Sequence, residues 1–93
     1  MSVYMIVATE DPARLARIVR AAFNEQNRYI LNGDFACFVS FSGSSQELSN
    51  LLDLEGTNKK EDRPCPAVIT SVTTYGGFAP TSLWEWLNAR MRG

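Results

Sequence analysis

The sequence predicts a single α+β domain over residues 1–93, with a four-stranded antiparallel sheet, two helices on one of its faces and an extra C-terminal helix. Three observations predict this class. An apolar run at 3–8 precedes a segment with helical periodicity, a hairpin signal at 29–41 separates two helical segments, and a β-branched run at 67–75 precedes a third. The composition, 45% hydrophobic and 20% charged, is that of an ordinary globular protein.

The first two elements are predicted to be a buried strand and an amphipathic helix. Residues 3–8 are apolar throughout, which is typical of a strand covered on both faces. Asp11 is a good N-cap and Pro12 suits the first helical position, so a helix is expected from there to about Asn24. Its core-facing stripe has i, i+3, i+4, i+7, i+8 spacing and comprises Leu15, Ile18, Val19, Ala22 and Phe23.

A hairpin is predicted next. Asn32 and Gly33 form a strong turn signal, in which both residues are expected to have positive φ. They join the arms 29–31 and 34–41. Both faces of the second arm are fairly apolar, so this strand is expected in the interior of the sheet.

Two further helices and one strand complete the pattern. Ser44 and Glu47 predict a capping box for a short helix that is expected to end at Gly56. After a polar loop, residues 67–75 predict a strand, which Gly76 and Gly77 end. The last helix is expected at about 81–91, and Ser82 with Glu85 gives it a second capping box.

A hairpin between two helices is the mark of the split βαβ, or ferredoxin-like, arrangement. Right-handed crossovers then place both main helices on one face of the sheet. The first strand and the second hairpin arm become the central pair. The other face is left for the terminal helix or for a second subunit.

The composition excludes several kinds of chemistry. The chain has no histidine, which removes the commonest general base and transition-metal ligand, so serine–histidine and cysteine–histidine hydrolases and the usual zinc sites are excluded. A net charge of −1 gives no global attraction to nucleic acid or to an anionic membrane. We expect no cofactor, no metal and no membrane association.

The two cysteines are predicted to be reduced thiols of a cytoplasmic protein, since no secretory signal precedes them. Cys37 falls in a strand. Cys65 stands between two prolines and is expected to be exposed, but without a histidine partner no catalytic role is predicted for it.

Three groups of residues are candidates for a functional site. An arginine stripe opposite the core-facing side of the first helix would suit phosphate backbones, or would be an ordinary solvated face; it comprises Arg14, Arg17, Arg20 and the nearby Arg28. Glu10 and Asp11 end the first strand, where a metal-binding carboxylate would lie, although helix capping explains Asp11 fully. The third group is apolar and comprises Phe78, Trp84, Trp86 and Met91.

This third group predicts an interaction surface. Trp84 and Trp86 lie two residues apart and therefore point about 200° apart on a helix. One tryptophan is expected to face the core with Leu83 and Leu87, and the other to point outward. Tryptophan is enriched in binding hot spots, so the outer ring would belong to a dimer seam or to a partner-binding surface.

The order of elements over 3–75 resembles the small ferredoxin-like family that includes the CRISPR adaptation-complex small subunit and related virulence-associated ribonucleases. The segment from Tyr75 to Leu87 is also similar to the tail of uncharacterised members of such groups. The resemblance implies the fold and pairing as a homodimer through the sheet. The family's first strand usually ends in an aspartate that serves a metal site; here it ends at Thr9, with Glu10 and Asp11 just beyond.

Three functional hypotheses follow. The first is a non-enzymatic protein-interaction module, a homodimeric regulator or inhibitor of the kind that phages and mobile elements carry. The second is a divergent metal-dependent nuclease that uses Glu10 or Asp11. The third is a nucleic-acid-binding module that uses the arginine stripe.

Overall fold

The computed structural model describes residues 2–57, 63–77 and 80–91. Four strands form one antiparallel sheet in the order β2-β3-β1-β4. Their bounds are β1 Ser2–Ala8, β2 Arg28–Ile30, β3 Ala36–Phe41 and β4 Ala67–Val72. As predicted, β1 and β3 are the central pair, and the strand order is that of the ferredoxin-like arrangement.

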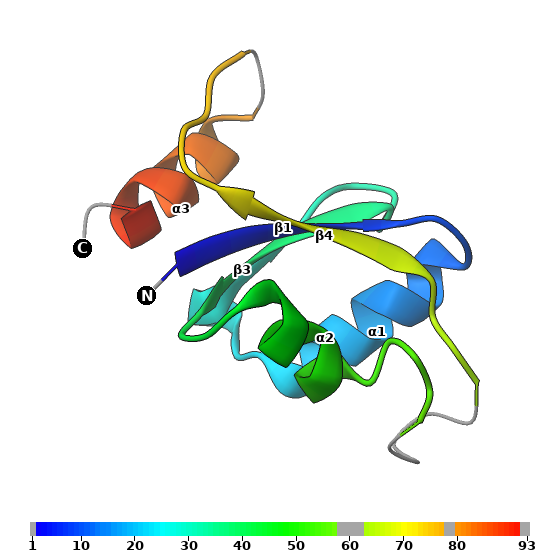
Figure 1. The fold of residues 1–93 in the computed structure, drawn as a ribbon. Helices are drawn as coiled ribbons and strands as arrows, with labels where there is room; N and C mark the ends of the chain where they lie inside the picture. Colours follow the sequence, from blue (N-terminus) through cyan, green and yellow to red (C-terminus); the bar gives the residue numbers. More distant parts are fainter. Residues whose placement is uncertain (1, 58–62, 78–79, 92–93) are drawn as a thin grey trace.

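The helices lie on both sides of this sheet (Figure 1). Helices α1 (Pro12–Ala22) and α2 (Ser45–Leu52) cover one face, as the sequence predicts. Helix α3 (Thr81–Met91) lies against the other face, where the sequence left a place for it. A short 3-10 helix, Glu25–Asn27, leads into β2.

The larger hydrophobic core lies between the sheet and the helices α1 and α2. Side chains alternate along a strand, so every second residue of β1 and β3 points into this core. Tyr4 and Ile6 come from β1, and Cys37 and Val39 come from β3. The core is completed by buried side chains of the helices and of the segments beside them, namely Leu15, Ile18, Val19, Leu48, Leu52, Leu54 and Cys65.

A smaller core lies under α3, on the opposite face of the sheet. Its buried members are Val3, Phe38, Leu83 and Leu87. Partly buried side chains surround them, namely Met5, Tyr29, Leu31, Val72, Trp84, Trp86 and Met91. One short helix covers this face, so many of its apolar side chains remain half-exposed.

The predicted caps of α1 and α2 are confirmed. Asp11 accepts a hydrogen bond from the backbone N–H of Arg14, and Ser44 and Glu47 form both hydrogen bonds of a capping box. The end of α2 differs from the prediction, because Asp53, with φ 54°, is its C-cap. Gly56 has another role: a Cβ on it would lie 2.7 Å from the carbonyl carbon of Arg63.

Three other local details differ from the prediction. The hairpin connection has positive φ at Gly33 and Asp34 and not at Asn32, and it is longer than predicted, because the backbone N–H of Leu31 donates to Ala36 and leaves residues 32–35 between the strands. Strand β4 ends at Val72. Helix α3 has the predicted bounds, but Ser82 lies within its first turn, and its hydroxyl bonds to that of Tyr29 instead of capping the helix.

In the part of the chain that the structure describes, no helix has the length and apolar character needed to cross a membrane.

Candidate functional site

A mainly apolar groove lies between α3 and β4. It encloses about 470 Å³. Met5 and Phe38 form its floor from the central strands, and Thr70, Ser71 and Val72 line it from β4. Its remaining walls come from α3 and the segment after β4, namely Leu83, Trp84, Leu87, Thr74, Tyr75 and Gly76. We call it the α3 groove.

A stacked aromatic pair stands at the rim of this groove. The rings of Tyr75 and Trp84 are 5.6 Å apart, centre to centre, and only 19° from parallel. Trp84 is half-buried, whereas Tyr75 is 43% exposed. Each ring restrains the other, so the pair presents a large apolar surface that loses little conformational entropy on binding.

The two tryptophans have different surroundings. Both are half-buried, so the expectation of one inner and one outer ring is wrong. Trp86 lies 6.4 Å from the ring of Tyr29, and the guanidinium of Arg90 lies 5.8 Å from its centre. Arg90 also donates a 2.6 Å hydrogen bond to the carbonyl of Gln26, so this end of α3 is fastened to the β2 side of the sheet.

Of the four predicted interaction residues, the structure therefore places Trp84 in the groove and Trp86 in a packing role. Met91 is half-buried and packs against the smaller core, and Phe78 lies outside the described residues. Sequence reasoning missed Met5, Phe38 and Tyr75. The alternation of side chains along β1 and β3 could have identified Met5 and Phe38. These two residues pair across the strands on the face opposite the larger core.

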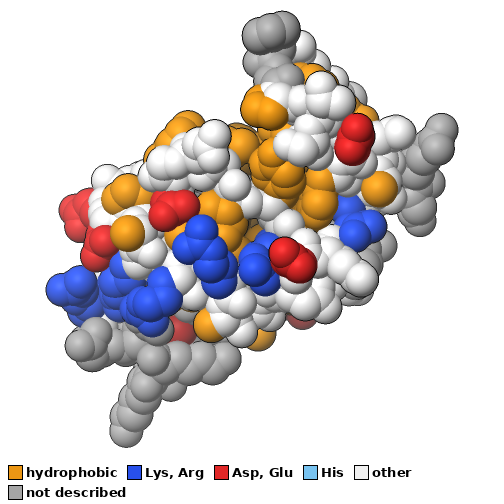
Figure 2. All heavy atoms as spheres, turned by 180° about the vertical axis from the view of Figure 1, so that it is seen from behind, with side chains coloured by type: hydrophobic (Ala, Val, Ile, Leu, Met, Phe, Trp, Pro, Cys, Tyr) orange, Lys and Arg blue, Asp and Glu red, His pale blue; other side chains and the backbone are white. Residues whose placement is uncertain are grey.

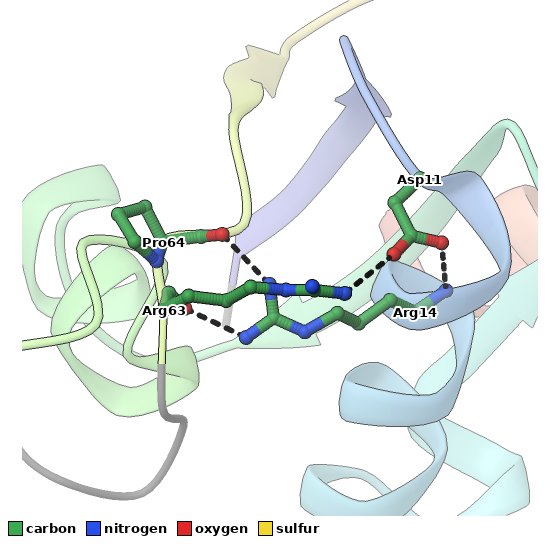
Figure 3. A network of polar contacts seen from close by, with 4 residues as sticks. All are labelled: Asp11, Arg14, Arg63 and Pro64. Atoms are coloured by element: carbon green, nitrogen blue, oxygen red, sulfur yellow. Dashed lines mark hydrogen bonds and ion pairs between the residues drawn. The ribbon is translucent and has the colours of Figure 1, made fainter.

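The predicted acidic residues Glu10 and Asp11 lie at the start of α1. Figure 3 shows Asp11 with Arg14 and Arg63 beside it. Asp11 accepts from its own helix and also pairs with the guanidinium of Arg63 at 3.3 Å. Glu10 is exposed and lines a polar hollow of about 350 Å³ beside Arg14 and Arg63. Among the described residues, no cluster of three or more carboxylates or thiols is placed to hold a metal ion.

Arg14 is not on the exposed side of α1, where the sequence placed it. It is only 8% exposed, and its guanidinium donates hydrogen bonds of 2.7 and 2.6 Å to the carbonyls of Pro64 and Arg63 (Figure 3). These two hydrogen bonds hold the segment that leads into β4 against α1. A guanidinium can reach two carbonyls at once because its donors lie in a planar fork.

The other three arginines remain at the surface to different degrees. Arg17 and Arg20 are exposed, and Arg20 lies 3.4 Å from the carboxylate of Asp34. Arg28 donates a 2.6 Å hydrogen bond to the carbonyl of Phe23. Figure 2 shows arginine side chains gathered across one face, with acidic side chains among them.

Both cysteines are buried, so the expectation of an exposed Cys65 is wrong. The backbone N–H of Cys65 donates a 2.7 Å hydrogen bond to Leu54, which draws its side chain into the larger core. Burial also raises the pKa of the Cys37 thiol from its ordinary value of 9.0 to about 12. At neutral pH Cys37 is therefore a protonated core side chain.

Comparison with known proteins gives no relative: no family model, no curated protein and no solved structure matches this chain.

Proposed function

We propose that the chain is a small non-enzymatic interaction module, a regulator or inhibitor that acts by binding another protein. The observation that carries this proposal is the α3 groove with the stacked pair Tyr75 and Trp84 at its rim. Tryptophan and tyrosine are enriched among the few residues that contribute most of the binding energy of protein interfaces. The groove offers a partner an apolar anchor site.

The chemistry of the groove supports binding over catalysis. The described residues that line the groove include no carboxylate, amine, imidazole or thiol, the groups that most often transfer protons in active sites. A general acid or base needs a pKa close to the working pH. The groove residues can therefore bind and orient an apolar side chain, but none of them is suited to proton transfer at neutral pH.

Self-association is part of the same proposal. The chain has a mass of 10.4 kDa, so light scattering distinguishes a monomer from the homodimer that we expect. A mass that rises on addition of DNA or RNA would instead favour the nucleic-acid-binding hypothesis, particularly if the rise disappears steeply with added salt.

Affinity purification from an extract of the native cells tests the binding surface. Four forms are compared: wild type, Tyr75→Ala, Trp84→Phe and, as a matched control, Asn88→Ala, which alters an exposed residue of the same helix outside the groove. We expect a protein that the wild type and Asn88→Ala retain equally and that Tyr75→Ala loses. Retention should be unchanged by EDTA and by nuclease treatment.

Two results would overturn the proposal. The first is equal retention of the same proteins by Tyr75→Ala and Asn88→Ala. The second is nuclease activity that requires a divalent metal and disappears in Asp11→Asn while the protein remains folded.

A further inference from the structure

The sheet has two very different edges. The β2 edge has only three residues and carries Arg28. The β4 edge has six residues, none of them charged or proline, and none of them buried. Val68, at 54%, is among the most exposed large apolar side chains of the described residues. Natural sheets commonly protect an edge with charge, proline or a short strand, and β4 has none of these within it.

The outer side of β4 carries hydrogen-bonding groups that no strand of the described chain pairs. The backbone N–H of Thr9 donates a 3.0 Å hydrogen bond to Pro66, so residues 9 and 66 form a hydrogen-bonded pair of the antiparallel ladder between β1 and β4. Hydrogen-bonded pairs alternate along such a ladder. Val68, Thr70 and Val72 therefore point their backbone groups at β1, and Ala67, Ile69 and Ser71 point theirs outward.

Hollows lie beside β4 on both faces of the sheet. On one face is the mainly apolar α3 groove. On the other is a hollow of about 330 Å³ between α2 and β4, whose polar wall comprises Ser45, Gln46, Ser49 and Glu55. We call it the α2 hollow. Because side chains alternate along a strand, a strand added beside β4 would direct one set toward each hollow.

We propose that β4 accepts, as a fifth strand, an extended segment of another protein whose side chains alternate between large apolar and polar. The apolar set would lie toward Tyr75 and Trp84, and the polar set toward Ser45 and Ser49. This inference rests on the proposed function and names its mode of recognition. Strand addition gains affinity from main-chain hydrogen bonds and specificity from the pockets under alternate side chains.

The lining of the two hollows favours another protein over a second copy of this chain. In an antiparallel β4–β4 pair the two strands present the same faces. The copy would then direct Val68, Thr70 and Val72 toward the α3 groove and Ala67, Ile69 and Ser71 toward the α2 hollow. Valine and threonine are small for a groove of about 470 Å³, and Ala67 and Ile69 offer no hydrogen bond to Ser45, Gln46 and Ser49. A segment with large apolar residues on one face and polar residues on the other matches both linings better than β4 itself does.

Ser71 allows a sharp test, because its N–H points outward and is not part of the β1 ladder. Ser71→Pro removes this donor and places the proline ring where an added strand would approach, yet leaves the hydrogen bonds to β1 in place. Ser71→Ala is the matched control, since it removes the hydroxyl and keeps the N–H. Thermal unfolding and circular dichroism verify that both variants are folded.

The probe is a panel of dye-labelled ten-residue peptides in which leucine, valine or phenylalanine alternates with serine, threonine or glutamine. Peptides of the same composition, with the apolar residues spaced for a helix, are the controls. Fluorescence anisotropy gives the dissociation constants. We expect alternating peptides to bind Ser71→Pro about tenfold more weakly than Ser71→Ala or worse, through loss of a hydrogen bond and obstruction of the edge.

Three results would overturn the inference. One is no preference for the alternating peptides up to about 1 mM, the range of weak specific binding. Another is equal affinity for Ser71→Pro and Ser71→Ala. The third is a wild-type dimer that Ser71→Pro alone converts to a monomer, which would assign the edge to a second copy. A captured partner that needs Tyr75 but binds Ser71→Pro normally would likewise refute strand addition, while the proposed function would stand.

Discussion

Arg14 fastens the segment before β4 to α1, and replacing it should destabilise the fold far more than replacing an exposed arginine. Its guanidinium donates to the carbonyls of Arg63 and Pro64 at 2.6 and 2.7 Å. Hydrogen bonds from a charged donor contribute about 1.5–3 kcal/mol each. The two carbonyls are only partly buried and regain some water in a variant, so we expect Arg14→Ala to lower the free energy of unfolding by ~3 kcal/mol.

The matched control is Arg20→Ala in the same helix. Arg20 pairs with Asp34 at 3.4 Å, and both side chains are well exposed, so this change should cost only ~0.5 kcal/mol. Arg14→Lys should lie between the two, because an ammonium lacks the planar fork that reaches both carbonyls. Urea unfolding followed by tryptophan fluorescence measures all three variants. A loss in Arg14→Ala no larger than that in Arg20→Ala would refute the reasoning.

Three further predictions concern the backbone, the core and the sheet edge. Gly56→Ala should destabilise by ~2–4 kcal/mol in the same urea assay, because φ is +70° and the new Cβ would meet backbone atoms at 2.7–2.9 Å; an unchanged midpoint would contradict this. Because burial raises the pKa of Cys37 to about 12, the folded thiol keeps its proton at pH values where the unfolded thiol loses it. Stability should therefore fall as pH rises from about 9 to 12, and Cys37→Ala should lack this part of the slope; equal slopes would contradict it. Amide exchange measured by NMR should alternate along β4, slow at Val68, Thr70 and Val72 and fast at Ile69 and Ser71, whereas uniform protection would mean that the outer edge is already paired.

The fold was predictable because local signals agreed with one another. The stripe of α1, the capping box of α2 and the β-branched run of β4 each pointed to one element, and their order allowed few topologies. Boundaries were less predictable. Strand β4 was predicted to reach Tyr75 and ends at Val72. The hydroxyl of Ser82, predicted to cap α3, instead meets that of Tyr29, a residue 53 positions away in the sequence.

The candidate site was only partly predictable, because it depends on contacts between distant segments. Helical periodicity placed Arg14 among exposed residues, but its partners lie 49 and 50 positions further along the chain. Cys65 stands in a polar segment and is nevertheless buried, since its backbone bonds to Leu54. The segment containing Trp84 was recognised as a candidate surface, but its stacking on Tyr75 follows from the path between β4 and α3, which no local pattern specifies.

A photoreactive amino acid in place of Tyr75 tests the central claim most directly. The same replacement at Asn88, on the exposed side of α3, is the control. Cells that produce either form are irradiated, and covalent adducts are identified by mass spectrometry. The account predicts that position 75 links to a second protein and that position 88 does not. Adducts formed equally from both positions, or from position 75 to nucleic acid alone, would contradict it.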